Sequence, residues 1–433
     1  MSQPTHFGFL QRSRFALSAW AVVAAFGAYF CMYGFRKPFT GGEYLGVVDW
    51  GVSFKTVLIT AQTVGYALSK FVGIKVISEM PAGRRAVGIL VLIGLSHVAL
   101  LGFGLVSAPY NLIFLFFNGL PLGMVFGLVL GYLEGRGTTE ALTAGLCASF
   151  IIAGGVTKTV GAKLIDLGVD PMWMPFVAGC IFALPLVGFV WMLSKIPPPS
   201  AVDIALRSER TVMSAADRWS FFRRYAPGLT LLIVVYLLVT ILRGVRDDFG
   251  PEIWRGLGWN GAPSVFTWSE MFVALGVVVA SGAAFLIRDN RKAFHFAMGT
   301  SMFGLLLAGL AVFGLSRGWL GGMGFMVMVG LGMYLPYVAV HTTLFERLIA
   351  MTRDRGNLGY LMYLADSFGY LGFVLVIVVK DYATVGGEVL PFFTSATWVA
   401  AGIAVVALAT SWAYFARNRP KPAAVAMSDG RGR

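Results

Sequence analysis

The chain has 433 residues, of which 57% are hydrophobic and 13% are charged, and its mean hydropathy is +0.76. This composition lies far outside the range of soluble globular proteins and is typical of a protein with many membrane spans. The formal net charge of +13 does not indicate nucleic-acid binding, because Lys and Arg fall in short connections between apolar runs.

Apolar runs of about 20 residues, the length that crosses a bilayer, follow one another along the chain. Six are predicted in the first half, at 15–44, 56–78, 85–106, 111–133, 141–165 and 172–193. Six more are predicted in the second half, at 229–248, 264–287, 293–315, 320–344, 358–379 and 390–416. We therefore predict an all-α membrane protein with 12 transmembrane helices in two six-helix bundles.

One sizeable polar segment, with a proline run and a cluster of basic residues, separates the two sets of spans. The predicted domains are an N-terminal bundle at 1–194, a cytoplasmic linker at 195–226, a C-terminal bundle at 227–417 and a cytoplasmic tail at 418–433. Lys and Arg concentrate in the tails and the even-numbered connections, which places both termini in the cytoplasm. We expect a multi-pass protein of the plasma membrane, the inner membrane of a bacterium.

The stretch YGFRKPFTGG places an arginine and a lysine at the end of the first predicted span. Tyr29, Tyr33 and Arg36 are spaced i, i+4, i+7 and therefore share one helical face. The first span of the second half repeats this spacing from Tyr236 to Arg243. Two stripes in register indicate two repeats that line one cavity; the alternative is that both arginines snorkel to the membrane surface.

A pair of arginines facing one cavity predicts an anion site. Guanidinium is always charged, and its planar fork suits bidentate contact with phosphate or carboxylate. We therefore expect Arg36 and Arg243 to bind an oxyanion between the two bundles.

Ionisable side chains within membrane spans are costly and are candidates for functional sites. Tyr66 and Lys70 continue a polar stripe in the second span, where Lys70 either faces the cavity or is packed or snorkelling. In the fifth span, Lys158 follows Gly154 and Gly155, which we expect to serve close helix packing.

The acidic residues and one histidine within the spans are candidates for ion pairing or for coupling. Glu270 is either the ion-pair partner of a cavity cation or a proton-coupling group, and Asp366 has the same alternatives. Asp247, one turn beyond Arg243, is a candidate to neutralise it. His341 has either a substrate or coupling role or a purely structural one.

Several short stretches resemble one transporter family. They are GAYFCMYGFRKPF, GYALSKFVGIKVISE, ILRGVRDDFGPEIW, VHTTLFERL and DSFGYLGF. Together they resemble the organophosphate:phosphate antiporters of the major facilitator superfamily, which include glycerol-3-phosphate and hexose-phosphate exchangers. The resemblance implies that Arg36 and Arg243 bind phosphate. It also implies that Lys70 is the family's lysine in the second span, that His341 is its histidine in the tenth span and that Glu270 is its acidic residue in the eighth span.

The chain departs from that family in the fifth and fourth spans. ASFIIAGGVTK lacks the histidine that the family has before its glycines, and LPLGMVFGLVLGYLEGRG lacks the family's tryptophan-proline segment. Because groups that recognise the organic part of the substrate differ, the resemblance implies a divergent relative with a different organic moiety.

The predicted function is secondary active transport of a phosphate-bearing organic anion by alternating access, in exchange for inorganic phosphate. The alternatives are a proton-coupled facilitator for a muropeptide, drug or lipid-linked sugar, and a transporter-like organophosphate sensor. No nucleophile-base or metal constellation is recognisable, so we expect no enzyme activity, metal or cofactor. The expected partners are a small anion and the lipid bilayer, with no nucleic acid, and the expected state is a monomer.

Overall fold

The computed structural model of the chain describes residues 13–47, 50–133, 139–198, 215–352, 358–383 and 388–417. Within these ranges all regular elements are helices. Ten of the described helices are long and apolar enough to cross a membrane, by length and composition. The predicted class, an all-α multi-pass membrane protein, is confirmed.

The first half of the chain forms six long helices joined by short connections. They are α2 (Arg14–Tyr33), α3 (Phe54–Glu79), α4 (Arg85–Leu105), α5 (Leu112–Leu133), α6 (Thr139–Asp166) and α7 (Met174–Ser194). Two short 3-10 turns, η1 (Pro38–Gly41) and η2 (Ala82–Arg84), precede α3 and α4.

The second half repeats this plan with one helix interrupted. Its long helices are α9 (Ala215–Asp248), α11 (Ser264–Phe285), α12 (Asn290–Ser316), α13 (Gly322–Ala339), α15 (Leu358–Ala383) and α16 (Val389–Arg417). A short helix, α10 (Gly250–Gly256), follows α9, and α13 continues through a π-helical turn, η3 (Val340–Leu344), into α14 (Phe345–Thr352).

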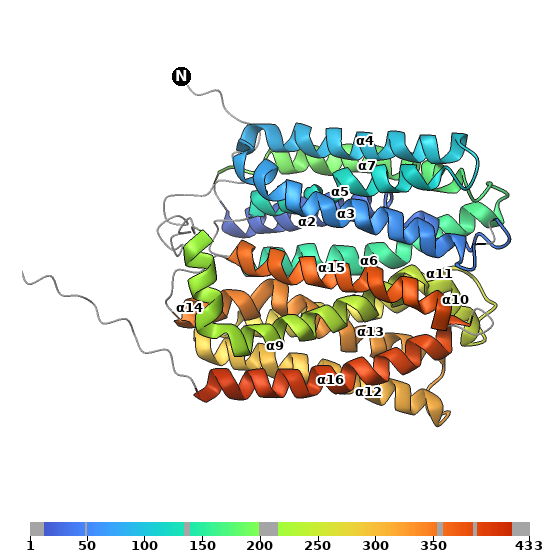
Figure 1. Ribbon diagram of the computed structural model, residues 1–433. Coiled ribbons are helices and arrows are strands. Elements are labelled where there is room, and N and C mark those ends of the chain that lie inside the picture. Colours follow the sequence, from blue (N-terminus) through green and yellow to red (C-terminus); the bar gives the residue numbers. More distant parts are fainter. Residues whose placement is uncertain are drawn as a thin grey trace, which may run out of the picture.

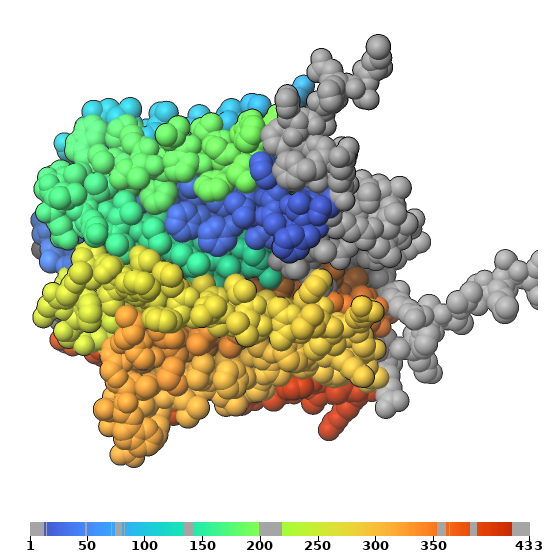
Figure 2. Space-filling view, turned by 180° about the vertical axis from the view of Figure 1, so that it is seen from behind, coloured from blue at the N-terminus to red at the C-terminus, as the bar shows by residue number. Residues whose placement is uncertain are grey.

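The helices of each half gather on one side of the molecule. Figure 1 shows the long helices running roughly alongside one another, with the first half above and the second half below, and Figure 2 shows the same division from behind. The halves meet along two helix pairs, α3 with α15 and α6 with α11. At the second pair, a Cβ on Gly155 would lie 2.3 Å from the carbonyl oxygen of Phe266, so this glycine permits the expected close packing.

The first helix is shorter than predicted. The apolar run suggested a span at 15–44, but α2 ends at Tyr33 and a turn leads into η1 at Pro38. Proline lacks the backbone N–H that a continuing helix needs, and its ring would collide with the preceding turn. Arg36 therefore lies in the turn after α2, although it remains buried close to Tyr33.

Helices α3 and α5 touch backbone to backbone at a glycine. A Cβ on Gly119 would lie 2.1 Å from the carbonyl oxygen of Gln62, far inside van der Waals contact. In a membrane, where hydrophobic burial does not drive helices together, such small-residue contacts provide much of the packing energy. The close approach also brings α3 and α5 into register for the polar network described below.

We expect Gly119→Ala to destabilise the protein by ~1–3 kcal/mol, the usual effect of overpacking, because the new methyl meets backbone that cannot rotate away. Gly94→Ala in α4 is the matched control, since a Cβ there has nothing within 4 Å, and alanine's higher helix propensity should stabilise it by up to about 1 kcal/mol. Thermal unfolding of the purified protein in detergent measures both. Equal changes in the unfolding temperature of the two variants would contradict this account of the helix contact.

Candidate functional site

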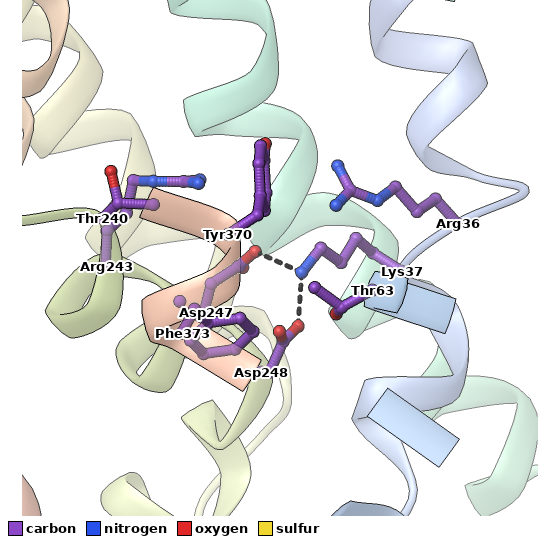
Figure 3. Close-up of a pocket in the computed structure, with 10 residues that line it drawn as sticks. Arg36, Lys37, Thr63, Thr240, Arg243, Asp247, Asp248, Tyr370 and Phe373 are labelled. Atoms are coloured by element: carbon purple, nitrogen blue, oxygen red, sulfur yellow. Dashed lines mark hydrogen bonds and ion pairs between the residues drawn. The ribbon is translucent and has the colours of Figure 1, made fainter. Parts of the chain in front are cut away.

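Arg36 and Arg243 face each other between the two halves. Arg36 comes from the turn after α2 and Arg243 from α9, and both are more than nine-tenths buried. Figure 3 shows the two side chains extending toward one another, with Tyr370 of α15 between them in this view. They line a cavity of about 10 Å³, room for about one water molecule. The other lining residues are Lys37, Thr63, Thr240, Gly244, Asp247, Asp248, Tyr370 and Phe373.

Neither arginine forms an ion pair with any residue that the structure describes. Each guanidinium instead lies near tyrosine rings: the Cζ of Arg36 is 3.8 Å from the centre of Tyr66 and 5.7 Å from that of Tyr33. The Cζ of Arg243 is 4.5 Å from the centre of Tyr337. The Nε atoms of both arginines are buried without a hydrogen-bond partner among the described residues. Tyrosine faces hold the two cations but do not neutralise them.

The other buried cations of the described chain all have carboxylate partners. Eight lysines and arginines are buried, and six of them pair with six acidic residues. Two positive charges, those of Arg36 and Arg243, are left over. The pairs are Lys37 with Asp247 and Asp248, Lys55 with Glu252, Lys70 with Asp366, Lys158 with Asp247, Arg246 with Glu270, and Lys380 with Asp381.

A polar network fixes the turn that carries Arg36. The carbonyl oxygen of Arg36 accepts a hydrogen bond from Gln62 Nε2 at 2.9 Å, and that of Phe35 accepts one from Asn118 Nδ2 at 3.0 Å. Gln62 Nε2 also donates to Asn118 Oδ1 at 2.7 Å. Carbonyls at the end of a helix lack intrahelical partners, and these two amides supply them inside the bundle. α3 and α5 thereby hold Arg36 in place.

A cluster of ion pairs joins the halves below the arginines. Lys37 Nζ lies 2.8 Å from Asp247 Oδ2 and also contacts Asp248, as the dashed lines in Figure 3 show. Lys158 of α6 donates to Asp247 Oδ1 at 2.6 Å and to its carbonyl oxygen at 2.7 Å. Asp247, the candidate to neutralise Arg243, thus forms its ion pairs with two lysines of the other half.

Two further ion pairs extend this cluster toward the same end of the molecule. Lys55 at the start of α3 bonds to Glu252 of α10 at 2.7 Å, and Glu43 contacts Arg255. Lys55 also donates to the carbonyl oxygen of Thr40 in η1 at 2.8 Å. Each pair crosses between the halves, so ion pairs join the two halves at this end of the molecule.

A second polar cluster surrounds Asp366 on α15. Its Oδ2 lies 3.4 Å from Lys70 Nζ of α3, and its Oδ1 accepts a hydrogen bond from the Tyr236 hydroxyl of α9. The Nε2 of His341 lies 3.8 Å from Asp366 Oδ1 and 3.4 Å from the Tyr236 oxygen. The structure thus brings four of the predicted site residues together in one group.

Glu270 takes the ion-pair role rather than a place at the central cavity. Its Oε1 accepts a hydrogen bond from Arg246 Nη1 at 2.6 Å, within the second half, and Arg246 also donates to the carbonyl oxygen of Met326. Sequence reasoning missed Arg246, Lys37 and Asn118. The run RGVRDD contains the signal for the first, because Arg246 follows Arg243 by three residues and so lies near the same face.

The fold is shared with membrane transporters of known structure. A D-xylose-proton symporter matches with a TM-score of 0.60 at 13% sequence identity, over 92% of this chain and 97% of that one. A mutant of the nucleoside transporter NupG matches with a TM-score of 0.57 at 14% identity, over 92% of this chain and 100% of that one. At this level of identity the likeness establishes the fold, which is a transporter fold. No curated protein matches the sequence.

The sequence itself places the chain in a family. Residues 38–418 match the model described as a family of unknown function (DUF5690), and the chain belongs to this family. The matched range includes Arg243 and the cluster around Asp366, whereas Arg36 and Lys37 lie just before its first residue.

We expect Asp247→Asn to destabilise the protein strongly, because it leaves buried lysines without their carboxylate. Removing one partner of a buried ion pair typically costs about 3–5 kcal/mol. Glu43→Gln is the control at the same end, since its partner Arg255 is 54% exposed and exposed pairs contribute about 1 kcal/mol or less. Thermal unfolding in detergent compares the two variants. A smaller fall in unfolding temperature for Asp247→Asn than for Glu43→Gln would contradict the conclusion that Asp247 neutralises buried lysines.

Proposed function

We propose that the protein is a secondary transporter that moves a phosphate-bearing organic anion by alternating access, in exchange for inorganic phosphate. The observation that carries this proposal is the pair of buried, facing guanidinium groups of Arg36 and Arg243, neither of which has a carboxylate partner among the described residues. Buried charges are normally paired, so two unpaired arginines between the halves fit a site whose counter-charge arrives with the ligand.

The charge balance supports a divalent anion. Of the eight cations buried in the described part of the chain, two have no carboxylate partner there, and a phosphate monoester carries roughly −1.5 to −2 at pH 7. Its three terminal oxygens can accept bidentate hydrogen bonds from two guanidinium forks at once. A monovalent carboxylate would neutralise only one of the two arginines.

The same two charges provide a reason for exchange. Like charges repel across a low-dielectric gap, so an empty site resists closure of the halves around it, and a bound dianion relieves that repulsion. A ligand shifts a conformational equilibrium only through such a difference in free energy between the two forms. The cavity of about 10 Å³ must widen to admit any organic anion, which requires the halves to rock apart.

The proposed topology has twelve spans, bundles at 1–194 and 227–417 joined by the linker at 195–226, and both termini with the tail at 418–433 in the cytoplasm. In this topology α3 and α15 are the two spans beyond the ten found by length and composition, and they carry Lys70 and Asp366 into the interface. In this topology the turn after α2 faces outward, so the ion pairs around Asp247 close the outer side of the cavity. The proposed location is the inner membrane of a bacterium, and the proposed state is a monomer.

The test is counterflow of labelled phosphate into proteoliposomes loaded with phosphate. We expect wild-type protein to exchange, and Arg36→Lys and Arg243→Lys each to lose activity by about tenfold to a hundredfold, because lysine keeps the charge but loses the bidentate fork, worth ~1.5–3 kcal/mol.

Arg317→Lys is the matched control, an arginine that lies 5.4 Å from the ring of Phe313 away from the site, and it should exchange normally. Intact exchange in both site variants would exclude the paired-fork site. Binding of phosphate without counterflow would instead indicate a sensor, and no interaction with phosphate would favour a facilitator for another solute.

A further inference from the structure

The cluster around His341 has one hydrogen-bond position that a proton would fill. His341 Nδ1 lies 3.0 Å from the carbonyl oxygen of Tyr337, an acceptor only, so Nδ1 carries the ring hydrogen of the neutral form. The Tyr236 hydroxyl donates its hydrogen to Asp366 Oδ1. The remaining contact, between His341 Nε2 and the Tyr236 oxygen at 3.4 Å, therefore has no hydrogen unless Nε2 is protonated.

A proton on Nε2 would complete a continuous relay. The imidazolium would donate to the Tyr236 oxygen, which donates in turn to Asp366, and the positive ring would stand 3.8 Å from Asp366 Oδ1. His341 also lies in η3, the π-helical turn that interrupts the helix between α13 and α14. Single π-helical turns inside α-helices occur frequently at functional sites.

Both favourable and unfavourable charges face His341. Asp366 on α15 favours the proton, whereas Lys70 on α3 and Arg243 on α9 oppose it. The hydroxyl of Tyr236 and the ring of Tyr337 are neutral neighbours. Burial of the ring also disfavours a charge there, and neutralising Arg243 would remove one of the opposing charges.

The ring of Tyr337 connects the histidine to the proposed anion site. Arg243 Cζ lies 4.5 Å from the centre of this ring, and the centre of the His341 ring lies 4.6 Å from it. An anion bound to Arg243 would remove one of the two positive charges that oppose protonation of His341. Coupling of this kind is reciprocal, so protonation must also strengthen anion binding.

We propose that His341 Nε2 is a proton-binding site and that this proton and the anion at the Arg36–Arg243 pair bind cooperatively. The inference rests on the proposed function and adds a second ligand, a proton, to its site. Each anion that crosses would then be accompanied by a proton, whichever anion is exchanged.

The proton would also act on the contact between the halves. Lys70 and Asp366 form an ion pair across the α3–α15 interface. A protonated His341 gives Asp366 a cation partner within its own half, which weakens its hold on Lys70 and eases separation of the two helices. Glu270 has no comparable part, because its partner Arg246 belongs to the same half.

The experiment measures the Kd of labelled inorganic phosphate for the full-length protein in detergent, at pH 6 and at pH 8, in wild type and in His341→Gln. Phosphate's own titration affects both proteins equally, so the readout is the ratio of the variant Kd to the wild-type Kd. We expect this ratio to be about fivefold or more larger at pH 6 than at pH 8, since the coupling between linked sites is typically 5–150-fold and a proton site is more fully occupied at pH 6 than at pH 8.

His341→Asn serves as a second variant if glutamine disturbs the fold, and should give the same result. The control is His295→Gln, which alters a histidine bonded to Trp412 between α12 and α16 and should retain the wild-type pH dependence. If the Kd ratio for His341→Gln is the same at both pH values, or if the ratio for His295→Gln changes with pH by the same factor, the proton site is overturned while the proposed function stands. If wild-type protein binds no phosphate at either pH, the proposed function fails and the proton inference fails with it.

Discussion

The structure depends on the requirement that a charge buried within a membrane protein needs a counter-charge. Six buried cations form ion pairs with carboxylates of the chain, and several of those pairs cross from one half to the other. The inter-half contacts are therefore electrostatic as well as steric. Arg36 and Arg243 are the two exceptions among the described residues. Their tyrosine neighbours make burial tolerable without cancelling the charge, which is the condition that a reversible anion site needs.

The helical scaffold explains why these two groups meet. Pro38 ends the path of α2, so that Arg36 sits in a turn whose free carbonyls are bound by Gln62 and Asn118. Arg243 needs no such turn or hydrogen-bond network, because it lies within the continuous helix α9. The two halves thus use related sequences in different ways, one fixing its arginine by a turn and a polar network, the other by an unbroken helix.

Sequence reasoning selected many of the residues that the fold brings together in the candidate site, but it could not assign their ion pairs. The spacing of tyrosine and arginine identified Arg36 and Arg243, and the cost of burying charge singled out Lys70, His341 and Asp366, which the fold brings into two adjoining groups. Residues one turn apart on a helix are the partners that sequence suggests first, but the ion pairs of Asp247 are with lysines of the other half. Lys37, Lys55 and Arg246 pair with groups in other helices, and no local pattern indicates those partners.

The sequence by itself determined the class of protein, the positions of most helices and the face of α9 that carries Arg243. Hydropathy and helical periodicity are properties of neighbouring residues, so they can be read along the chain. Only the tertiary structure decided which charges are neutralised. Arg36 and Lys37 are adjacent in the sequence, yet Lys37 binds two carboxylates of the other half while Arg36 binds none that the structure describes. That difference depends on distances between helices that are far apart in the chain, and it separates a structural cation from a proposed ligand-binding one.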